Sequence, residues 1–293
     1  MPKPIALCCG DIHLCEKSPA MWDKDAWWPC QENMLVQINN IATEYGVGVV
    51  CSGDVFDKPR MSPKVEMLAM KHLRHWWMIP GQHDLPNHNI DLMPESSYGV
   101  LAEVVAPFLP LPYIYEFPWG AEHIPQAEKD VANTSAICNL HVALVHAMVW
   151  QGKEPYPGAP STGNVLNLVK MLHGYDVIVC GDNHGGFVTT VGNTVVINCG
   201  STMRRTVAQL DYQPQVHLLY DDKTVESINL DTSKDVVSDK HKQKRVDRED
   251  RIAAFVDTLS LGGEINLSYQ ENMMRALVDV EEEVKAVIVE EMV

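Results

Sequence analysis

The sequence predicts an α/β fold. Short apolar runs bounded by turn residues alternate with longer segments of helical period, which is typical of a sheet covered by helices. From residue 187 to residue 230 the pattern changes to β-rich runs separated by turn pairs, which indicates hairpins. We therefore expect a mixed or antiparallel sheet in the second half of the core.

The first half should contain three strands separated by two helices. The apolar runs predict strands at residues 5–9, 47–51 and 77–79, with helices at residues 31–45 and 63–76. Ser62 suits the N-cap of the second helix, and Pro63 suits its first helical position.

The second half begins with irregular sequence and then returns to regular elements. Residues 107–136 are rich in proline and aromatic residues and have little period. Further elements follow from the apolar pattern, with strands at residues 113–117, 142–145 and 177–180 and a helix at residues 165–172. Gly192-Asn193 and Asp221-Asp222 are turn pairs between the later β-rich runs.

The end of the chain differs in composition. Residues 221–293 carry 18 acidic and 10 basic residues, a far higher charge density than the first 220 residues have. Helical patterns at residues 248–259 and 270–289 lie in this part. We place a boundary near residue 235, between a core of residues 1–235 and a charged helical segment of residues 236–293.

The overall charge argues against a generic DNA or membrane-surface binder. The 23 basic and 39 acidic residues give a net charge of −16, whereas nucleic-acid affinity usually rests on basic side chains that neutralise phosphates. We see neither a signal peptide nor an apolar stretch near the roughly 20 residues of a membrane helix. We expect a cytoplasmic protein whose eight cysteines are reduced core thiols.

Metal-binding and polar residues recur directly after the apolar strands. They are Asp11 and His13, Asp54 and Asp57, Gln82, His83 and Asp84, His146, and Asp182 and His184. The carboxyl ends of strands form the ligand-binding edge of open α/β sheets, so five strand ends should converge on one rim. Imidazole, carboxylate and amide groups are ligands of divalent metals, and more of them are present than one ion requires.

The order of these groups resembles the motif series of calcineurin-like metallophosphoesterases. That series is D-x-H, G-D-x-x-D, G-N-H-D, a strand-end His and G-H-x-H, and the chain reads D-I-H, G-D-V-F-D, G-Q-H-D, His146 and G-D-N-H. The resemblance covers residues 4–235. The forms of residues 53–59 and 198–201 look most like SbcD-type DNA-repair nuclease subunits of bacteria and bacteriophages, which work with a coiled-coil ATPase. The resemblance implies a four-layer α/β/β/α sandwich with a small helical C-terminal appendage.

The resemblance also implies a role for each strand-end residue. Two divalent ions would be bound, the first by Asp11, His13 and His184, the second by Gln82, His146 and Asp182, with Asp54 bridging both. His83 would be a catalytic residue that faces the scissile phosphate without ligating metal, and Asp84 would orient its imidazole.

Two residues depart from the family pattern, and both fall on the second ion. Gln82 stands where Asn is usual, and Asp182 stands where the first His of G-H-x-H is usual. With Asp182 as a ligand the sites would hold three carboxylates, which favours Mn, or Mg, over Zn. The alternative is that Asp182 only caps a turn and that the second ion binds weakly or not at all.

Residues outside the motifs offer candidates for substrate binding. Arg204 and Arg205 follow a rim motif and are candidates for phosphate contacts. Trp22, Trp27 and Trp28 follow the first motif and either stack on unpaired bases or pack in the core.

These features together predict a two-metal phosphodiesterase that acts on DNA as an exonuclease or endonuclease. A phosphoesterase for a small molecule or a phosphoprotein is one alternative, and a non-enzymatic scaffold that has lost its second metal is another. The expected partners are DNA and an SbcC-like coiled-coil ATPase or a second copy of the chain, bound through the helical end.

Overall fold

The computed structural model describes residues 1–106, 112–120, 138–155 and 157–239. One compact unit spans Met1–Val237. The helices expected at residues 248–259 and 270–289 lie outside the described residues, as does most of the irregular stretch of residues 107–136.

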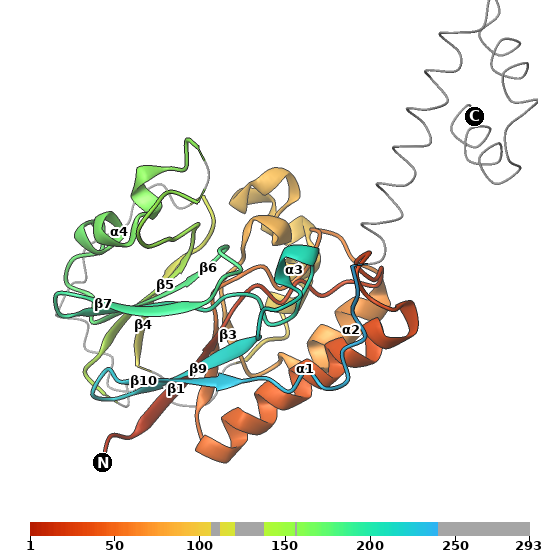
Figure 1. Cartoon of the computed structure of the whole chain (residues 1–293), viewed down its shortest axis with the longest axis horizontal. Coiled ribbons are helices and arrows are strands. Elements are labelled where there is room, and N and C mark those ends of the chain that lie inside the picture. Colours follow the sequence, from red (N-terminus) through yellow and green to blue (C-terminus); the bar gives the residue numbers. More distant parts are fainter. Residues whose placement is uncertain (107–111, 121–137, 156, 240–293) are drawn as a thin grey trace, which may run out of the picture. The chain divides into compact units, whose positions relative to one another are not determined.

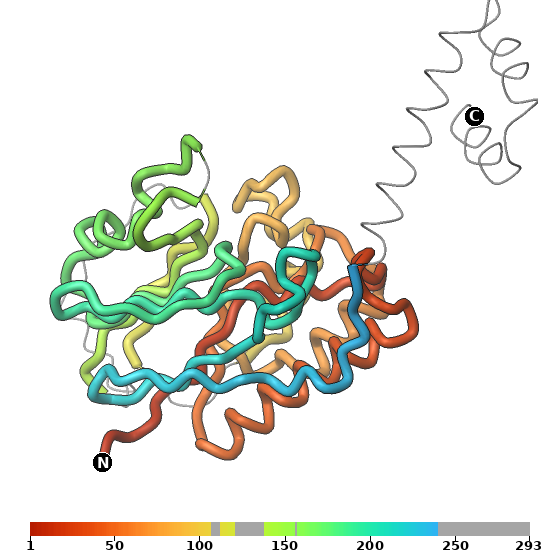
Figure 2. The backbone as a smooth tube through the Cα atoms, in the orientation of Figure 1, coloured from red at the N-terminus to blue at the C-terminus, as the bar shows by residue number. Residues whose placement is uncertain are grey.

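The first sheet has five strands in the order β10-β9-β1-β2-β3. Its parallel part is β1 (Pro4–Cys9), β2 (Gly48–Cys51) and β3 (Trp77–Met78). The hairpin of β9 (Gln215–Tyr220) and β10 (Val225–Asn229) adds to β1 in antiparallel fashion. Figure 2 shows this late segment, in cyan and blue, beside the red N-terminal strand.

The second sheet also has five strands, in the order β4-β5-β6-β8-β7. Four of them are parallel: β4 (Tyr113–Phe117), β5 (His141–His146), β6 (Val177–Gly181) and β8 (Thr194–Asn198). The edge strand β7 (Phe187–Val191) is antiparallel and joins β8 through Gly192-Asn193, as the turn pair predicts.

Three apolar clusters hold four layers together and confirm the α/β/β/α arrangement (Figure 1). Helices α1 (Lys24–Tyr45), α2 (Pro63–His72) and α3 (Ser97–Ala102) pack on the outer face of the first sheet. Between the sheets, side chains such as Ile5 and Val50 meet Val142 and Ile197. Helix α4 (Val165–Met171) covers the outer face of the second sheet.

Short 3₁₀ helices lie in the connections rather than in the layers. They are η1 (Gln82–Asp84), η2 (Pro86–His88), η3 (Ile90–Glu95), η4 (Ser161–Gly163) and η5 (Val207–Gln209). The first of them, η1, contains the Gln82, His83 and Asp84 of the G-Q-H-D motif and follows strand β3.

Helix α1 begins seven residues before the predicted start and contains Pro29. The carboxylate of Asp23 caps it by accepting hydrogen bonds from the backbone N–H groups of Asp25 and Ala26. Trp27 and Cys30 are buried on its inner face. Burial of these side chains outweighs the loss of one backbone hydrogen bond at the proline.

The described residues contain no membrane-crossing helix and no disulfide. No helix among them combines the length and apolar character that crossing a bilayer requires. All eight cysteines are unpaired, and only Cys138 is not fully buried. Seven of the eight thiols therefore lie in the core, as expected, and Cys138 does not.

Candidate metal centre

The ends of strands from both sheets meet at one place. Asp11 and His13 follow β1 and Asp54 follows β2, all from the first sheet, while the second sheet supplies His146 at the end of β5 and Asp182 and His184 after β6. Among the described residues, three sets of side chains have all their ligand atoms within 4.8 Å of one another. The first group is Asp11, His13 and His184, the second group is Asp11, Asp54 and His146, and a third set joins His13 to Asp57 and His83. The structure thus brings the predicted ligands of both ions together at the junction of the sheets.

The backbone is strained at four of these positions. Asp11, His13 and Asp54 have φ values of 48°, 50° and 51°, and Asp182 has a φ of 88°. Left-handed backbone is unfavourable for residues with a side chain, and residues held in it often cluster at functional sites, although Lys223 adopts it in the turn between β9 and β10. The strain aims the side chains of successive strand ends at a common point.

In the first group, the ring nitrogens of His13 and His184 face each other, and the carboxylate of Asp54 lies beside them. Nε2 of His13 lies 3.1 Å from Nε2 of His184 and 3.6 Å from Oδ2 of Asp54. Burial, followed by the charge of Arg205, lowers the pKa of both histidines, so both imidazoles are neutral at pH 7, as metal binding requires. Oδ2 of Asp54 is buried without a hydrogen-bond partner among the described residues, and a cation between these groups would satisfy it.

The second group is centred on His146. Its Nδ1 lies 2.6 Å from the carbonyl oxygen of Ser52, and its Nε2 lies 2.7 Å from Oε1 of Gln82. In a neutral imidazole that donates from Nδ1, Nε2 carries a lone pair, and this lone pair would face those of the Gln82 amide oxygen. The contact is therefore favourable only if Nε2 is protonated or if a cation lies between the two atoms. Burial favours the neutral form of His146, but hydrogen bonding to Asp54 and the charges of Asp54 and Asp11 outweigh burial and raise its pKa to about 10.

The two buried carboxylates respond in opposite ways to this environment. Burial, aided by the charges of Asp54 and Asp182, raises the pKa of Asp11 to about 7, although the charge of His146 and an N–H of Asp182 oppose it. Burial also acts to raise the pKa of Asp54, but the hydrogen bond and charge of His146 prevail and lower it to about 2. Asp54 is therefore the permanent anion between the two groups.

Gln82 and Asp182 lie beside the second group and contact each other. Nε2 of Gln82 donates to Oδ1 of Asp182 over 2.6 Å, which turns Oε1 of Gln82 towards His146. The backbone N–H of Asp182 donates to Oδ1 of Asp11 over 2.9 Å. The longer Gln side chain thus delivers its amide oxygen to the site, while ligation by Asp182 stays a prediction.

His83 lies at the edge of the first group. Its ring contacts that of His13 edge to face, with centroids 4.8 Å apart. Its Nδ1 lies 2.9 Å from the carbonyl oxygen of Asp57, and its backbone N–H donates to Oδ1 of Asp54 over 2.9 Å. The carbonyl fixes Nδ1 as a donor, so Nε2 is the ring nitrogen available to a substrate.

Asp84 does not orient His83, contrary to the prediction. The carboxylate of Asp84 is fully buried and accepts hydrogen bonds from the backbone N–H groups of Val55, Phe56 and Gly81. It therefore joins the loop after β2 to the loop after β3, and the carbonyl of Asp57 orients the imidazole.

Arg204 and Arg205 are both engaged with protein acceptors, and their contact with a phosphate stays a prediction. Arg204 donates to the carbonyl of Leu210 over 3.1 Å and to the carboxylate of Asp235 over 2.7 Å. Arg205 donates to the carbonyl of His13 over 2.7 Å and to the carboxylate of Asp57. Arg205 thereby connects the first metal-ligand loop to the residue that holds His83.

Two residues of the site have roles that the sequence did not indicate: Asp57 stood among the strand-end residues without a role, and Ser52 was not singled out. The carboxylate of Asp57 binds Arg205 and its carbonyl binds His83, and its place in the G-D-V-F-D motif was the signal. The carbonyl of Ser52 binds His146, but a backbone carbonyl is common to every residue type and gives no sequence signal.

The tryptophans after the first motif have mainly a packing role. Trp22 and Trp27 are only 5% and 1% exposed, and their rings pack edge to face. Trp28 is partly buried and has the ammonium group of Lys64 3.9 Å from its ring centroid.

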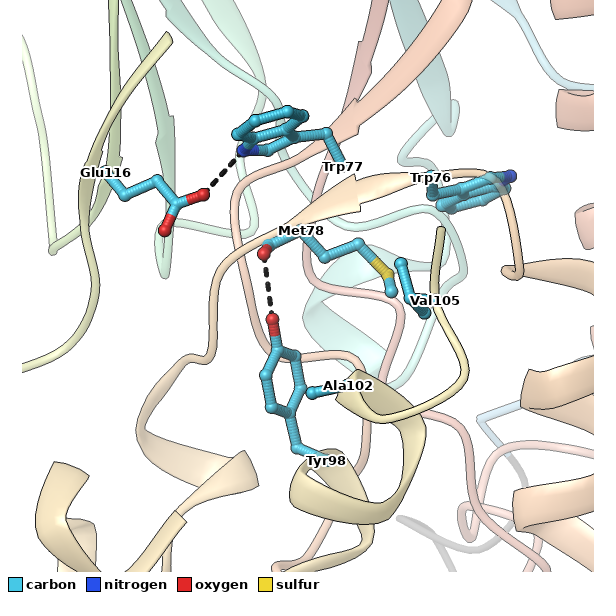
Figure 3. Close-up of a pocket in the computed structure, with 7 residues that line it drawn as sticks. All are labelled: Trp76, Trp77, Met78, Tyr98, Ala102, Val105 and Glu116. Atoms are coloured by element: carbon cyan, nitrogen blue, oxygen red, sulfur yellow. Dashed lines mark hydrogen bonds between the residues drawn. The ribbon is translucent and has the colours of Figure 1, made fainter. Parts of the chain in front are cut away.

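A separate cavity of about 240 Å³ lies beside β3 and β4 (Figure 3). In it Nε1 of Trp77 donates to Oε1 of Glu116 over 2.7 Å, and the hydroxyl of Tyr98 donates to the carbonyl of Met78 over 2.8 Å. None of the predicted metal ligands lines this cavity. It is therefore distinct from the candidate metal centre.

Comparisons with known proteins do not assign the chain to a family. No family model matches it, and no curated protein matches its sequence. Its structure is similar to that of an archaeal phosphodiesterase, with a TM-score of 0.39 and 14% identity over 77% of this chain and 99% of the other. It is also similar to the sulfate thiohydrolase SoxB of Thermus thermophilus, solved in complex with glycerol, with a TM-score of 0.44 and 11% identity over 78% of this chain and 56% of the other. These values are too low to transfer an activity.

Proposed function

We propose that the protein is a metal-dependent hydrolase that uses two divalent ions to cleave phosphodiester bonds in DNA. The observation that supports this most directly is the position of Asp54. Its Oδ2 lies 3.6 Å from His13 and its Oδ1 lies 3.5 Å from His146, so the carboxylate stands between two groups of ligand atoms. A carboxylate that is permanently ionised and shared in this way suits a bridging ligand.

Each residue at the rim would have a distinct part in metal binding. Asp11, His13 and His184 would hold the first ion, and Gln82, His146 and Asp182 would complete the second. Two such ions activate water and stabilise the attacking and leaving oxygens of an in-line displacement at phosphorus. The carboxylate-rich ligand set favours Mn or Mg over Zn.

The chain itself would supply the proton donor. His83 is held by the Asp57 carbonyl with Nε2 free for the substrate, and in its doubly protonated form it would donate from Nε2 to a phosphate oxygen or the leaving alkoxide. Asp57 and Arg205 would keep this imidazole in position relative to His13.

The proposal of DNA as the substrate rests on the SbcD-type form of residues 53–59 and 198–201. A net charge of −16 indicates weak intrinsic affinity for nucleic acid. We therefore propose that the protein acts in the cytoplasm together with a coiled-coil ATPase or a second copy of the chain, bound through residues 236–293.

Metal analysis and three substrates test this function. We expect near two Mn ions per chain and Mn-dependent cleavage of fluorescent DNA, both lost in Asp54→Asn and kept in the exposed control Asp211→Asn. Cleavage of a chromogenic phosphodiester or a phosphoprotein without cleavage of DNA would favour a phosphoesterase that acts on a small molecule or a phosphoprotein. Fewer than two ions and no turnover would favour the scaffold, and equal activity with Zn alone would contradict the preference for Mn.

A further inference from the structure

Trp119 lies beside the second group of ligands, at a strand end that none of the motifs marks. Strand β4 runs parallel to β5 with Phe117 opposite Val145, so the residues after Phe117 lie next to His146. The rings of Trp119 and His146 meet edge to face with their centroids 6.3 Å apart. The backbone N–H of Trp119 donates to the carbonyl of Pro80 over 3.3 Å, which anchors it to the loop that carries Gln82.

The indole of Trp119 is partly exposed, unlike most tryptophans of the protein. Trp22, Trp27, Trp76 and Trp150 are all at most 5% exposed and serve the core. Trp119 is partly exposed, as Trp28 and Trp77 are, but of these three it is the one whose ring contacts that of His146. A flat aromatic surface in this place is suited to stack on a flat ring of a ligand.

The charges around the site explain why such a surface would be needed. The two arginines nearest the rim motifs are engaged with protein acceptors, and the site itself consists of carboxylates and imidazoles. Because these two arginines are engaged with protein acceptors, an uncharged contact with the base would add affinity that they do not supply. Stacking on an aromatic ring stabilises each bound base by about 1–3 kcal/mol and tolerates any sequence.

We propose that Trp119 is a stacking platform for an unpaired nucleobase next to the scissile phosphate. The inference rests on the proposed function, since it assumes that the phosphate binds at the metal centre. It also specifies the substrate: the base must be out of the duplex to lie flat on the indole, so single-stranded or frayed ends are preferred over intact duplex.

Abasic oligonucleotides test the proposal. Fluorescent single strands carry one abasic nucleotide, placed in turn at the first and second positions of each end, and are compared with the unmodified strand. We expect the intact protein to favour the unmodified strand by about fivefold to a hundredfold in kcat/KM at one position, mainly through KM. Trp119→Ala should remove this preference, Trp119→Phe should keep most of it, and the control Trp28→Ala should leave it unchanged.

Binding gives a second measurement that does not depend on turnover. Anisotropy of the labelled strands, measured in a His83→Ala background with metal content and melting temperature checked, should show the same loss of discrimination in Trp119→Ala. If Trp119→Ala and the intact protein both cleave DNA and prefer the unmodified strand over the abasic strand equally, the stacking role of Trp119 is wrong, while the DNA function stands. If the intact protein neither binds nor cleaves either strand, the DNA function itself is wrong and the inference falls with it.

Discussion

Adding Mn to the metal-free protein should release protons from the site. Nε2 of His146 faces Oε1 of Gln82 and the carboxylate of Asp54. Burial favours the neutral imidazole, but the hydrogen bond to Asp54 and the charges of Asp54 and Asp11 outweigh burial and raise the pKa of His146 to about 10. Burial raises the pKa of Asp11 to about 7. A metal ligand must be deprotonated, so the ions compete with protons for both side chains.

The size of the effect follows from these two pKa values. At pH 7 His146 is almost fully protonated and Asp11 is about half protonated, so loading the site should release about 1.5 protons. At pH 6 the number should be about 1.9, and at pH 8.5 it should fall to about 1.0. Apparent metal affinity therefore rises with pH by a factor of about 10 to 100 per unit, because each proton released contributes tenfold.

Titration calorimetry in two buffers of different ionisation enthalpy measures this release. His146→Asn should lose about one of the released protons at pH 7, since the variant lacks the titrating ring. The exposed control His173→Asn should behave like the intact protein. A binding enthalpy that is the same in both buffers at pH 7, or a release that grows with pH, would refute the reasoning.

Three substitutions separate chemistry from positioning and stability. His83→Ala should bind near two ions but lose about 10²- to 10⁴-fold in kcat, and an unchanged rate would remove its role as proton donor. Asp84→Asn leaves at least one of three buried N–H groups without an acceptor, so urea unfolding should show a loss of about 2–4 kcal/mol in the free energy of unfolding. Arg205→Lys cannot span the His13 carbonyl and the Asp57 carboxylate, so both melting temperature and kcat should fall, whereas Arg204→Lys should lower only the melting temperature.

The sequence predicted the convergence of the site because strand ends carry it. Asp11, Asp54 and His146 directly follow or end apolar runs, and parallel strands place such residues on one edge. The direction of an individual side chain was less predictable. Asp84 is adjacent in sequence to His83, yet three backbone N–H groups compete for its carboxylate and turn it away from the imidazole.

Pairing over long distances was also beyond the sequence pattern. Hairpin turns indicated β9 and β10, but an alternating pattern does not specify a partner, and these strands add to β1 of the first sheet. The same applies to Trp119, which follows an ordinary strand in a proline- and aromatic-rich stretch. Its proximity to His146 arises only from the pairing of β4 with β5.

Because the ligands come from both sheets, metal affinity and the packing between the sheets are thermodynamically linked. Asp11, His13 and Asp54 move with the first sheet, and His146 and His184 move with the second. A shift of one sheet against the other would change the distances between the predicted ligands, and ions bound between the sheets would oppose that shift. The side chains between the sheets, far from any substrate, therefore help to set the geometry in which a phosphate would be held.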